Sequence, residues 1–369
     1  MPTLFDPIKL GALDLPNRIF MAPLTRVRAT PDGQVPTDMQ REHYVQRASA
    51  GLIFAEATCV SRRAVGYVGV PGIWSDEQTA AWKKIVDGVH AAGGRIVLQL
   101  WHAGRVSHSK LINGQLPLAP SPIKPAGHVA LLRPITEYET PHALTLAEIP
   151  GIIAEFKKGA ENAMTAGFDG VHIHSGNGYL LDQFLQDSTN QRTDQYGGSV
   201  ENRVRLLLEV TDAVSQVWGA DRVGMHLSPR MDTMDMGDSD PLGTFSHLAR
   251  ELGKRKLGWL LSREYVVDGN TKLDMLGNPQ EIANQIMHIG PRLKEAFGGP
   301  YIANEGFTLE SAHAAMAQGW ADAVAFGKLF ISNPDLPRRF AQKAPLNAFD
   351  PMTFYANGRE GYNDYPTLP

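Results

Sequence analysis

Cysteine is almost absent from this sequence. Cys59 is the single cysteine among 369 residues, which excludes an internal disulfide framework and any zinc or iron–sulfur site built on several cysteines. The sequence has no run of about 18 apolar residues, so no transmembrane helix is expected. The first residues, MPTLFD, lack the basic and apolar regions of a signal peptide. From these absences we expect a cytoplasmic protein without a membrane partner.

A strong charge of either sign is also missing. The sequence contains 35 basic and 39 acidic side chains and has a formal net charge of −4. That balance offers no electrostatic basis for binding nucleic acid, and none is expected as a partner. Two phosphate-binding patterns are absent as well: no G-x-G-x-x-G follows the first predicted strand, and no G-x-x-x-x-G-K-[ST] occurs anywhere. The usual dinucleotide-binding and P-loop folds therefore lose support.

What the sequence does contain is a repeated alternation of short apolar runs and amphipathic segments. Strands that alternate with helices are typical of a parallel sheet covered by helices. Two helical segments open with capping boxes, at Ser75–Gln78 and Thr145–Glu148, and the pair Gly93-Gly94 is expected to end the first of them. We predict eight strands, at Arg18–Met21, Leu52–Ala55, Arg95–Leu100, Gly170–His174, Val223–Leu227, Trp259–Ser262, Tyr301–Ala303 and Ala323–Phe326.

Eight such units favour a closed barrel over an open sheet. The predicted fold class is α/β, a single (β/α)8 TIM barrel that forms one domain over residues 1–369. Prolines 117, 120, 122, 125, 134 and 141 are crowded into residues 103–145. That density is typical of a long excursion, here placed after the third strand, and not of a barrel unit.

Catalytic residues of such barrels lie at the C-terminal ends of the strands and in the loops that follow. The densest candidate is the string from His174 to Tyr179, directly after the fourth strand. His174 and Asn177 are suited to polarise a carbonyl or nitro oxygen, while Tyr179 protonates a nearby carbon. Each residue alone is more simply explained by capping or packing. Together, at the predicted catalytic end, they favour catalysis.

Glycines after the seventh and eighth strands form a second candidate site. Glu305-Gly306 and Gly327-Lys328 stand where many barrels bind phosphate, although both glycines are equally consistent with ordinary turns. On the third strand, alternation places Gln99 and Trp101 on the same side. The Gln99 carboxamide could then face the edge of a heterocyclic ring, or be a satisfied polar group of the core.

Several long motifs occur in a fixed order along the sequence. They are NRIFMAPLTR at residues 17–26, PGIWS at 71–75, QLWHAGR at 99–105, DQYGGSVENR at 194–203, ISNPDL at 331–336 and GYNDYP at 361–366. The sequence resembles the old yellow enzyme family of FMN-dependent ene-reductases nearly from end to end. The resemblance implies FMN as cofactor, NADPH or NADH as reductant, no metal, and an activated alkene, such as an enone, as substrate. A nitro compound or a nitrate ester would also fit the substrate class. A monomer or small homo-oligomer is expected.

The resemblance also implies a role for each matching residue. In the family, hydride passes from the nicotinamide to FMN and then to the alkene. His174 and Asn177 match the pair that binds the activating oxygen, and Tyr179 matches the proton donor. Residues that match substrate-pocket positions are Tyr355 and Trp101. Residues that match flavin-binding positions are Pro23, Leu24, Thr25, Ala57, Gln99, His226, Glu305, Gly306, Phe307, Gly327 and Lys328.

Two of these positions depart from the family pattern. His226 stands where an arginine is usual, and a histidine near its ordinary pKa is charged only part of the time. Lys328 also replaces an arginine and cannot bind phosphate as a bidentate fork. Weaker FMN retention and a lower flavin potential are therefore expected. The segment Leu260–Tyr265 also differs from the commoner pattern, without an evident reason at this level.

Two other classes of function stay open from the sequence. A metal-dependent barrel hydrolase would draw on His102, His172, His174 and His226 at strand ends. Against it, we expect His172 and His174 to lie on opposite sides of their strand, and the eighth strand ends without a carboxylate. The other class is a barrel that binds FMN weakly and serves a non-redox role. His174, Asn177, Tyr179 and Thr25 all argue against that class.

Overall fold

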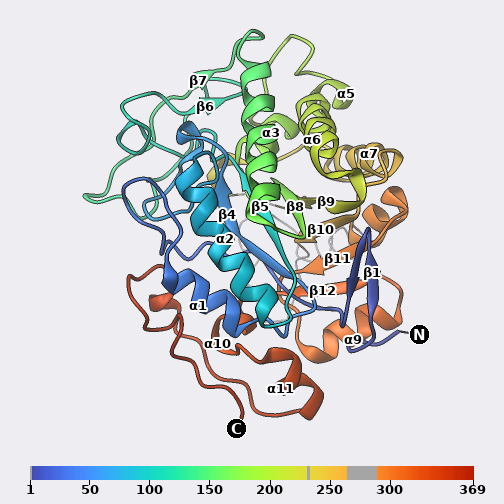
Figure 1. Cartoon of the computed structure of the whole chain (residues 1–369). Helices are drawn as coiled ribbons and strands as arrows, with labels where there is room; N and C mark the ends of the chain where they lie inside the picture. The colour runs from blue at the N-terminus through green and yellow to red at the C-terminus, as the bar shows by residue number, and fades with distance from the viewer. Residues whose placement is uncertain (1, 231–232, 264–288) are drawn as a thin grey trace.

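Eight parallel strands close into a barrel at the centre of the protein (Figure 1). The computed structural model describes residues 2–230, 233–263 and 289–369. The prediction of a (β/α)8 barrel and of all eight strands is confirmed, with small differences at the strand ends. In barrel order the strands are β3 (Ile19–Met21), β4 (Ile53–Cys59), β5 (Ile96–Trp101), β8 (Gly170–Ser175), β9 (Val223–Leu227), β10 (Trp259–Arg263), β11 (Tyr301–Asn304) and β12 (Ala323–Phe326).

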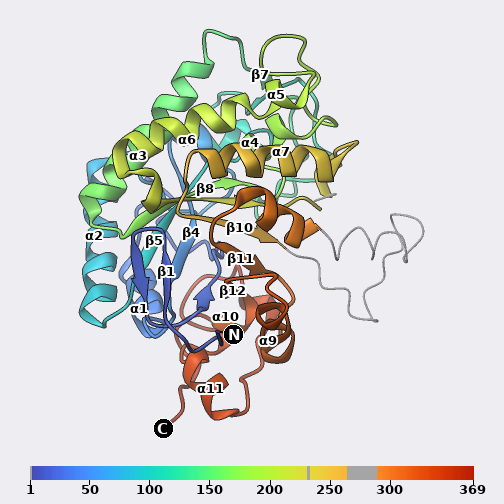
Figure 2. The ribbon, with the colours of Figure 1, turned by 90° about the vertical axis from the view of Figure 1, so that its right-hand side faces the viewer.

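Helices cover the outside of this barrel, as Figure 2 shows for α2, α3, α6 and α7. Every residue of β4 and β5 is buried, because the strands are covered by helices on one face and by the barrel interior on the other. No helix among the described residues is long and apolar enough to cross a bilayer. The helices are α1 (Asp38–Gln46), α2 (Asp76–Ala91), α3 (Ile149–Ala166), α4 (Leu180–Leu185), α5 (Val200–Arg203), α6 (Arg205–Trp218), α7 (Pro241–Lys254), α9 (Leu309–Ala317), α10 (Lys328–Ser332) and α11 (Leu336–Gln342).

One predicted helix start is confirmed and the other is only half formed. Ser75 and Gln78 cap each other's backbone N–H groups at the start of α2, and Gly93, with φ 81°, follows its C-terminus. At the second site α3 begins at Ile149, and the Glu148 carboxylate accepts from the backbone N–H of Thr145 at 2.8 Å. The Thr145 hydroxyl donates to that carboxylate instead of capping the helix. The other hydrogen bond of a capping box, from the backbone N–H of Glu148 to the Thr145 side chain, is therefore absent.

The long excursion after the third barrel strand is also confirmed. Between β5 and α3 it contains a short 3-10 helix (Ser109–Leu111) and two short paired strands, β6 (Leu118–Ala119) and β7 (His142–Ala143). An antiparallel hairpin, β1 (Ile8–Leu10) with β2 (Leu13–Leu15), precedes the barrel and was not predicted. Its apolar residues pack with Phe20 and Trp259 in a second core cluster.

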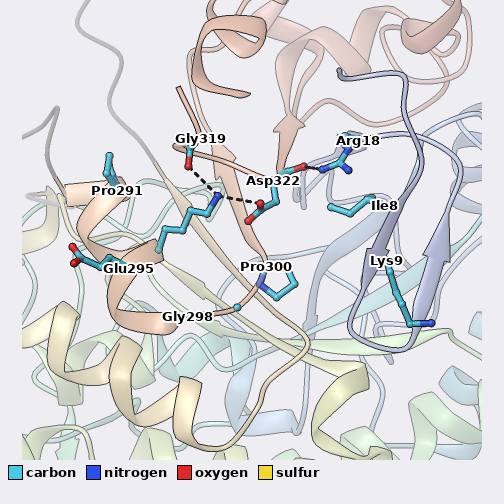
Figure 3. Close-up of a pocket in the computed structure, with 11 residues that line it drawn as sticks. Ile8, Lys9, Arg18, Pro291, Glu295, Gly298, Pro300, Gly319 and Asp322 are labelled. Carbon is cyan, nitrogen blue, oxygen red and sulfur yellow. Dashed lines mark hydrogen bonds and ion pairs between the residues drawn. The ribbon is translucent and has the colours of Figure 1, made fainter. Parts of the chain in front are cut away.

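A surface hollow of about 730 Å³ lies beside this hairpin, at the N-terminal ends of β11 and β3 (Figure 3). Several of its polar groups are engaged with one another: Lys294 bonds to Asp322 and to the Gly319 carbonyl, and Arg18 donates to the Asp322 carbonyl. Because catalytic groups of such barrels gather at the opposite ends of the strands, we attribute this hollow to the structural base of the barrel.

Candidate active site

The loop after β8 is folded tightly at the C-terminal mouth of the barrel. Asn177 and Gly178 both adopt left-handed backbone conformations, with φ 56° and 75°, which asparagine and glycine tolerate better than other residues. Two side chains hold the turn: the Ser228 hydroxyl accepts from the Asn177 N–H at 2.5 Å, and the Asp182 carboxylate accepts from the Gly178 N–H at 2.9 Å. The sequence of this loop therefore fixes where its functional side chains emerge.

Tyr179 emerges from this loop into a cluster of aromatic rings. Its ring centroid lies 5.3 Å from that of His174 and 5.0 Å from that of Trp101. Its hydroxyl oxygen lies 2.8 Å from the hydroxyl oxygen of Tyr67. Burial raises the pKa of Tyr179 to about 12, so the phenol keeps its proton at neutral pH.

Tyr67 is a site residue that the sequence analysis missed. It follows β4 in a loop, and its ring stacks on Trp101 with centroids 5.9 Å apart. The sequence offers only its position after the second barrel strand as a reason to select Tyr67, because no motif surrounds that tyrosine. Trp101 itself is buried, with 1% of its surface exposed. In this structure its ring packs against the rings of both tyrosines, and its role in substrate binding stays a prediction.

Three buried histidines line the barrel interior below this loop. His174 and His226 are neighbours in the register of β8 and β9, and their Nδ1 atoms lie 3.1 Å apart. His172 accepts a hydrogen bond from Trp259 Nε1 at 3.0 Å, and its ring lies 5.6 Å from that of His226. The expectation that His172 and His174 lie on opposite sides is wrong, since residues two apart on a strand share a face.

His226 carries no charge at neutral pH. Burial lowers its pKa well below the ordinary value, and the neighbouring His174, His172 and Arg263 lower it further. The expectation of a partly charged side chain is therefore corrected to a neutral one. Gln99 lies beside it, with Nε2 3.1 Å from His226 Nδ1, and pairs in register with Ala57 of β4. These predicted flavin-binding residues therefore share one wall of the interior.

The predicted residues after β3 lie on the neighbouring part of the rim. Pro23, Leu24 and Thr25 are half-buried, and the backbone N–H of the next residue, Arg26, donates to the buried Glu56 carboxylate at 3.1 Å. That bond ties the end of β3 to β4. An added Cβ on Gly327 would lie 3.3 Å from Leu24 Cδ2. Leu24 and the loop after β12 are thus adjacent.

The predicted phosphate-binding residues follow β11 and β12. Asn304 Nδ2 donates to the Ala325 carbonyl at 2.7 Å and so ties the ends of the two strands together. Glu305 and Gly306 then turn through left-handed conformations, with φ 82° and 75°, while Phe307 is half-buried. Gly327 precedes the short helix α10, and Lys328 is exposed at its first residue. The backbone of the two loops and the positively charged Lys328 side chain are therefore available together at the predicted phosphate-binding position.

Arg263 is the second site residue that sequence reasoning missed. It ends β10 and donates from Nη1 to Asn177 Oδ1 at 2.6 Å and from Nε to Glu305 Oε2 at 3.0 Å. The signal was present, because Leu260–Tyr265 departs from the family pattern. Of that segment, Glu264 and Tyr265 lie outside the described residues.

Tyr355 reaches the site from the C-terminal part of the chain. It is 54% exposed, and its proximity contributes to raising the pKa values of Tyr179 and Tyr67. It is therefore placed near the aromatic cluster, on the solvent side.

Comparison with known proteins decides between the classes of function. Over residues 3–347 the sequence matches the family described as NADH:flavin oxidoreductase / NADH oxidase. The chain belongs to this family. A relative, 12-oxophytodienoate reductase 1 from rice (Oryza sativa subsp. japonica), is 44% identical over 99% of this chain and 93% of its own length.

Solved structures agree with this assignment. An old yellow enzyme homologue from Zymomonas mobilis has a TM-score of 0.93 at 45% identity, with 100% of both chains covered. Morphinone reductase has a TM-score of 0.92 at 46% identity, with 100% of this chain and 96% of the other covered. The protein is therefore a flavin oxidoreductase of the old yellow enzyme type, which binds FMN and uses NAD(P)H to reduce activated C=C bonds. This membership excludes the metal-dependent hydrolase.

The residues at the mouth of this flavin oxidoreductase fit FMN. Three buried polar atoms, Nε2 of His174, Nε2 of His226 and Nε1 of Trp101, have no hydrogen-bond partner in the part of the chain that the structure describes. The Gln99 carboxamide and His226 are suited to the polar edge of a flavin ring. Gly306, Gly327 and Lys328 are suited to its phosphate. Within the same described residues, no group of three His, Cys, Asp or Glu side chains is arranged to hold a metal ion.

Proposed function

We propose that this protein reduces the C=C bond of alkenes activated by a carbonyl or nitro group, with the reacting alkene held by the loop after β8. The observation that carries this proposal is the convergence of His174, Asn177 and Tyr179 on one tightly folded turn. When bound, FMN supplies the hydride that adds to the β-carbon. The side chains of the loop supply the binding groups and the proton.

His174 and Asn177 are proposed to bind the activating oxygen. Burial, together with the positive charge of Arg263, lowers the pKa of His174 to about 3, so the imidazole is neutral and acts as a hydrogen-bond donor. A neutral imidazole donates from one nitrogen only. For Nε2 to be that nitrogen, Nδ1 must accept the hydrogen bond that it shares with His226 Nδ1. His226 then donates that bond and sets the tautomer of His174, and the Gln99 carboxamide, whose Nε2 lies 3.1 Å from the same His226 Nδ1, must turn its oxygen towards that nitrogen.

Tyr179 is proposed to deliver the proton to the α-carbon. Its phenol is protonated at neutral pH because burial disfavours the phenolate. The hydrogen bond with Tyr67 fixes the position of its hydroxyl. Hydride on one carbon and a proton on the other complete the saturated product.

NADPH is proposed as the physiological reductant, with NADH as the alternative. The support for a nicotinamide at this site is indirect: morphinone reductase, 46% identical to this chain, has a solved structure in complex with tetrahydroNAD. A cytoplasmic location, and a monomer or small homo-oligomer, stay predictions. Tyr355 is proposed as an aromatic wall of the substrate pocket, since it is exposed beside Tyr179.

The test is product analysis with the purified holoenzyme. With NADPH and 2-cyclohexenone under anaerobic conditions, cyclohexanone should form in equal amount to the NADPH consumed. Nitroalkenes and maleimides should be reduced in the same assay. Flavin-containing protein that consumes neither nucleotide in the presence of these alkenes would instead support the non-redox role.

A further inference from the structure

Arg263 lies where the structure places three strand ends together. It is the last residue of β10 and pairs in register with Asn304 of β11. On the other side β10 pairs with β9, which carries His226. The Arg263 and Glu305 side chains are 30% and 31% exposed, so the pair borders solvent at the mouth and is partly shielded from it.

Glu305 fixes the plane of the guanidinium. Its Oε2 accepts from Arg263 Nε at 3.0 Å, and its Oε1 forms an ion pair with Nη2. Two parallel bonds between a guanidinium and a carboxylate leave little rotational freedom, because both groups are planar forks. The remaining terminal nitrogen, Nη1, donates to Asn177 Oδ1 at 2.6 Å. The ion pair between Arg263 and Glu305 therefore sets the direction of the hydrogen bond to Asn177.

This contact determines which end of the Asn177 amide faces the substrate. A carboxamide has an acceptor oxygen and a donor NH2 group, and the two exchange places when the side chain rotates by half a turn. Only the NH2 group can bind a carbonyl or nitro oxygen. An arginine cannot accept a hydrogen bond, so it holds the Oδ1 end and leaves Nδ2 directed away from it.

We propose that Arg263 is a positioning residue for substrate binding, in which a guanidinium held by Glu305 orients the Asn177 amide so that Nδ2 donates to the activating oxygen. This inference rests on the proposed function of Asn177. A charge-assisted bond to Oδ1 also polarises the amide and strengthens its N–H donors. Since His226 is neutral, Arg263 brings a permanent positive charge to the side of the site where the activating oxygen binds.

The electrostatics of the neighbouring groups agree with this placement. The positive charge of Arg263 contributes to lowering the pKa values of His174 and His226, after the larger effect of burial. It therefore helps keep His174 a neutral donor. Arg263 thus acts on both His174 and Asn177, the two residues that are proposed to bind the activating oxygen.

The test is a double-mutant cycle on ligand binding. The probe is cyclohexanone, which carries the activating oxygen but no C=C bond, and its Kd is measured from the change in flavin absorbance of the holoenzyme. Asn177→Ala should weaken binding. Arg263→Met should weaken binding roughly tenfold, the loss expected for one charge-assisted hydrogen bond. In the Asn177→Ala background the same substitution should add less than about twofold, because the two groups act as one unit.

Arg255 provides the matched control. Its side chain is 27% exposed and is held by Asp212 through two nitrogens, just after the C-terminal end of α7 and away from the loop after β8. Arg255→Met should leave the Kd of cyclohexanone unchanged. Titration of each apoprotein with FMN, followed by quenching of flavin fluorescence, gives a readout independent of substrate. If Arg263→Met does not take up FMN, Arg263→Lys completes the same cycle, since lysine keeps the charge but lacks the fork.

Three outcomes are distinguishable. Wild-type binding by the Arg263 variants would overturn the inference. Equal weakening with and without Asn177 would also overturn it, because Arg263 would then act directly or through the fold. If Asn177→Ala itself binds cyclohexanone as well as the wild type does, the proposed function of the site fails, and not only the role of Arg263.

Discussion

His226 shows how burial changes the chemistry of a single substitution. In water an imidazole would be charged part of the time, but here its surroundings are His174, His172 and Gln99 in the closed interior of a barrel. Removing an imidazolium from water is unfavourable unless a carboxylate compensates it. Neutral His226 therefore cannot supply the positive charge that an arginine would place beside a reduced, negatively charged flavin.

Replacement of His226 by arginine should restore that charge. We expect His226→Arg to tighten FMN binding by about 10- to 100-fold, the range for one added charge-assisted hydrogen bond, and to raise the flavin potential. Fluorescence titration of the apoprotein and potentiometry of the holoenzyme measure the two quantities. His226→Gln, which stays neutral, should behave like the wild type in both. Unchanged affinity and potential in the arginine variant would refute this account of position 226.

Tyr179 should matter for only one half of the reaction. Without its hydroxyl, Tyr179→Phe loses the proton donor, and reduction of 2-cyclohexenone should slow by roughly 100-fold or more, as for other general acids. Reduction of the flavin by NADPH needs no proton from this residue and should be spared. Stopped-flow measurement separates the two half-reactions. Tyr67→Phe keeps the donor and should slow alkene reduction much less. Equal loss of both half-reactions in Tyr179→Phe would contradict the assigned role.

At the scale of elements, the C-terminal segment is held in place by buried arginines. Arg28 donates to the carbonyls of Thr353 and Phe354, at 3.0 and 2.8 Å, and its guanidinium lies 4.4 Å from the centroid of the Tyr362 ring. Arg26 donates to the Phe354 and Gly361 carbonyls. These contacts flank Tyr355. The segment therefore depends on the first barrel strand and its loop for its position over the site.

Loosening this segment should affect substrate binding more than chemistry. Arg28→Met removes the hydrogen bonds to the residues before Tyr355 while the catalytic loop keeps its own contacts. We expect the KM for 2-cyclohexenone to rise by about 3- to 10-fold, with a smaller change in kcat, since each hydrogen bond to a charged group contributes about 1.5 to 3 kcal/mol, only part of which reaches the substrate. Steady-state kinetics give both values. A fall in kcat at constant KM would argue against this role.

The elements that could be predicted from the sequence are those with a strong local pattern. The barrel strands are apolar runs buried on both faces, and α2 carries its cap and stop residues in its own sequence. The strands β1, β2, β6 and β7 have only two or three residues, too few to show a period. The half-formed box at Thr145 matched a pattern that the local turn satisfies in another way.

The candidate site was predictable as far as position and motif allowed. Rules about strand ends and the resemblance placed His174, Asn177 and Tyr179 at the mouth. The contacts of Tyr67 with Tyr179 and of Arg263 with Asn177 join residues 112 and 86 positions apart. Such pairs depend on the register of the closed barrel, which no local pattern reveals. Strand alternation alone would have placed His172 on the same face as His174, and the prediction of opposite faces was wrong.

At the scale of the whole molecule, buried histidines make the fold sensitive to acid. Burial is the main cause of a lowered pKa at all five of His43, His102, His172, His174 and His226. When the protein unfolds below about pH 6.5, these imidazoles take up protons that the folded protein does not bind. Three carboxyl groups act in the opposite direction and release protons on unfolding, because burial raises the pKa of Asp182 to about 7 and also raises the pKa values of Glu56 and Glu155.

The five histidines outnumber these three carboxyl groups, so stability should fall as the pH is lowered from about 6.5 towards 4. Each net proton taken up on unfolding steepens the loss by about 1.4 kcal/mol per pH unit. Urea unfolding of the holoenzyme at a series of pH values measures the slope. A constant free energy of unfolding across this range would show that the imidazoles are not held neutral in the folded state.

The most direct test of the whole account is an anaerobic titration of the flavin. The oxidised holoenzyme is bleached with one equivalent of NADPH, and 2-cyclohexenone is then added while the visible absorbance is followed. We predict that one equivalent of the enone restores the yellow colour in the wild type, and that the variant lacking both oxygen-binding groups, His174→Ala with Asn177→Ala, stays bleached on the same timescale. Reoxidation at equal rates in the two proteins would contradict the claim that the loop after β8 activates the alkene.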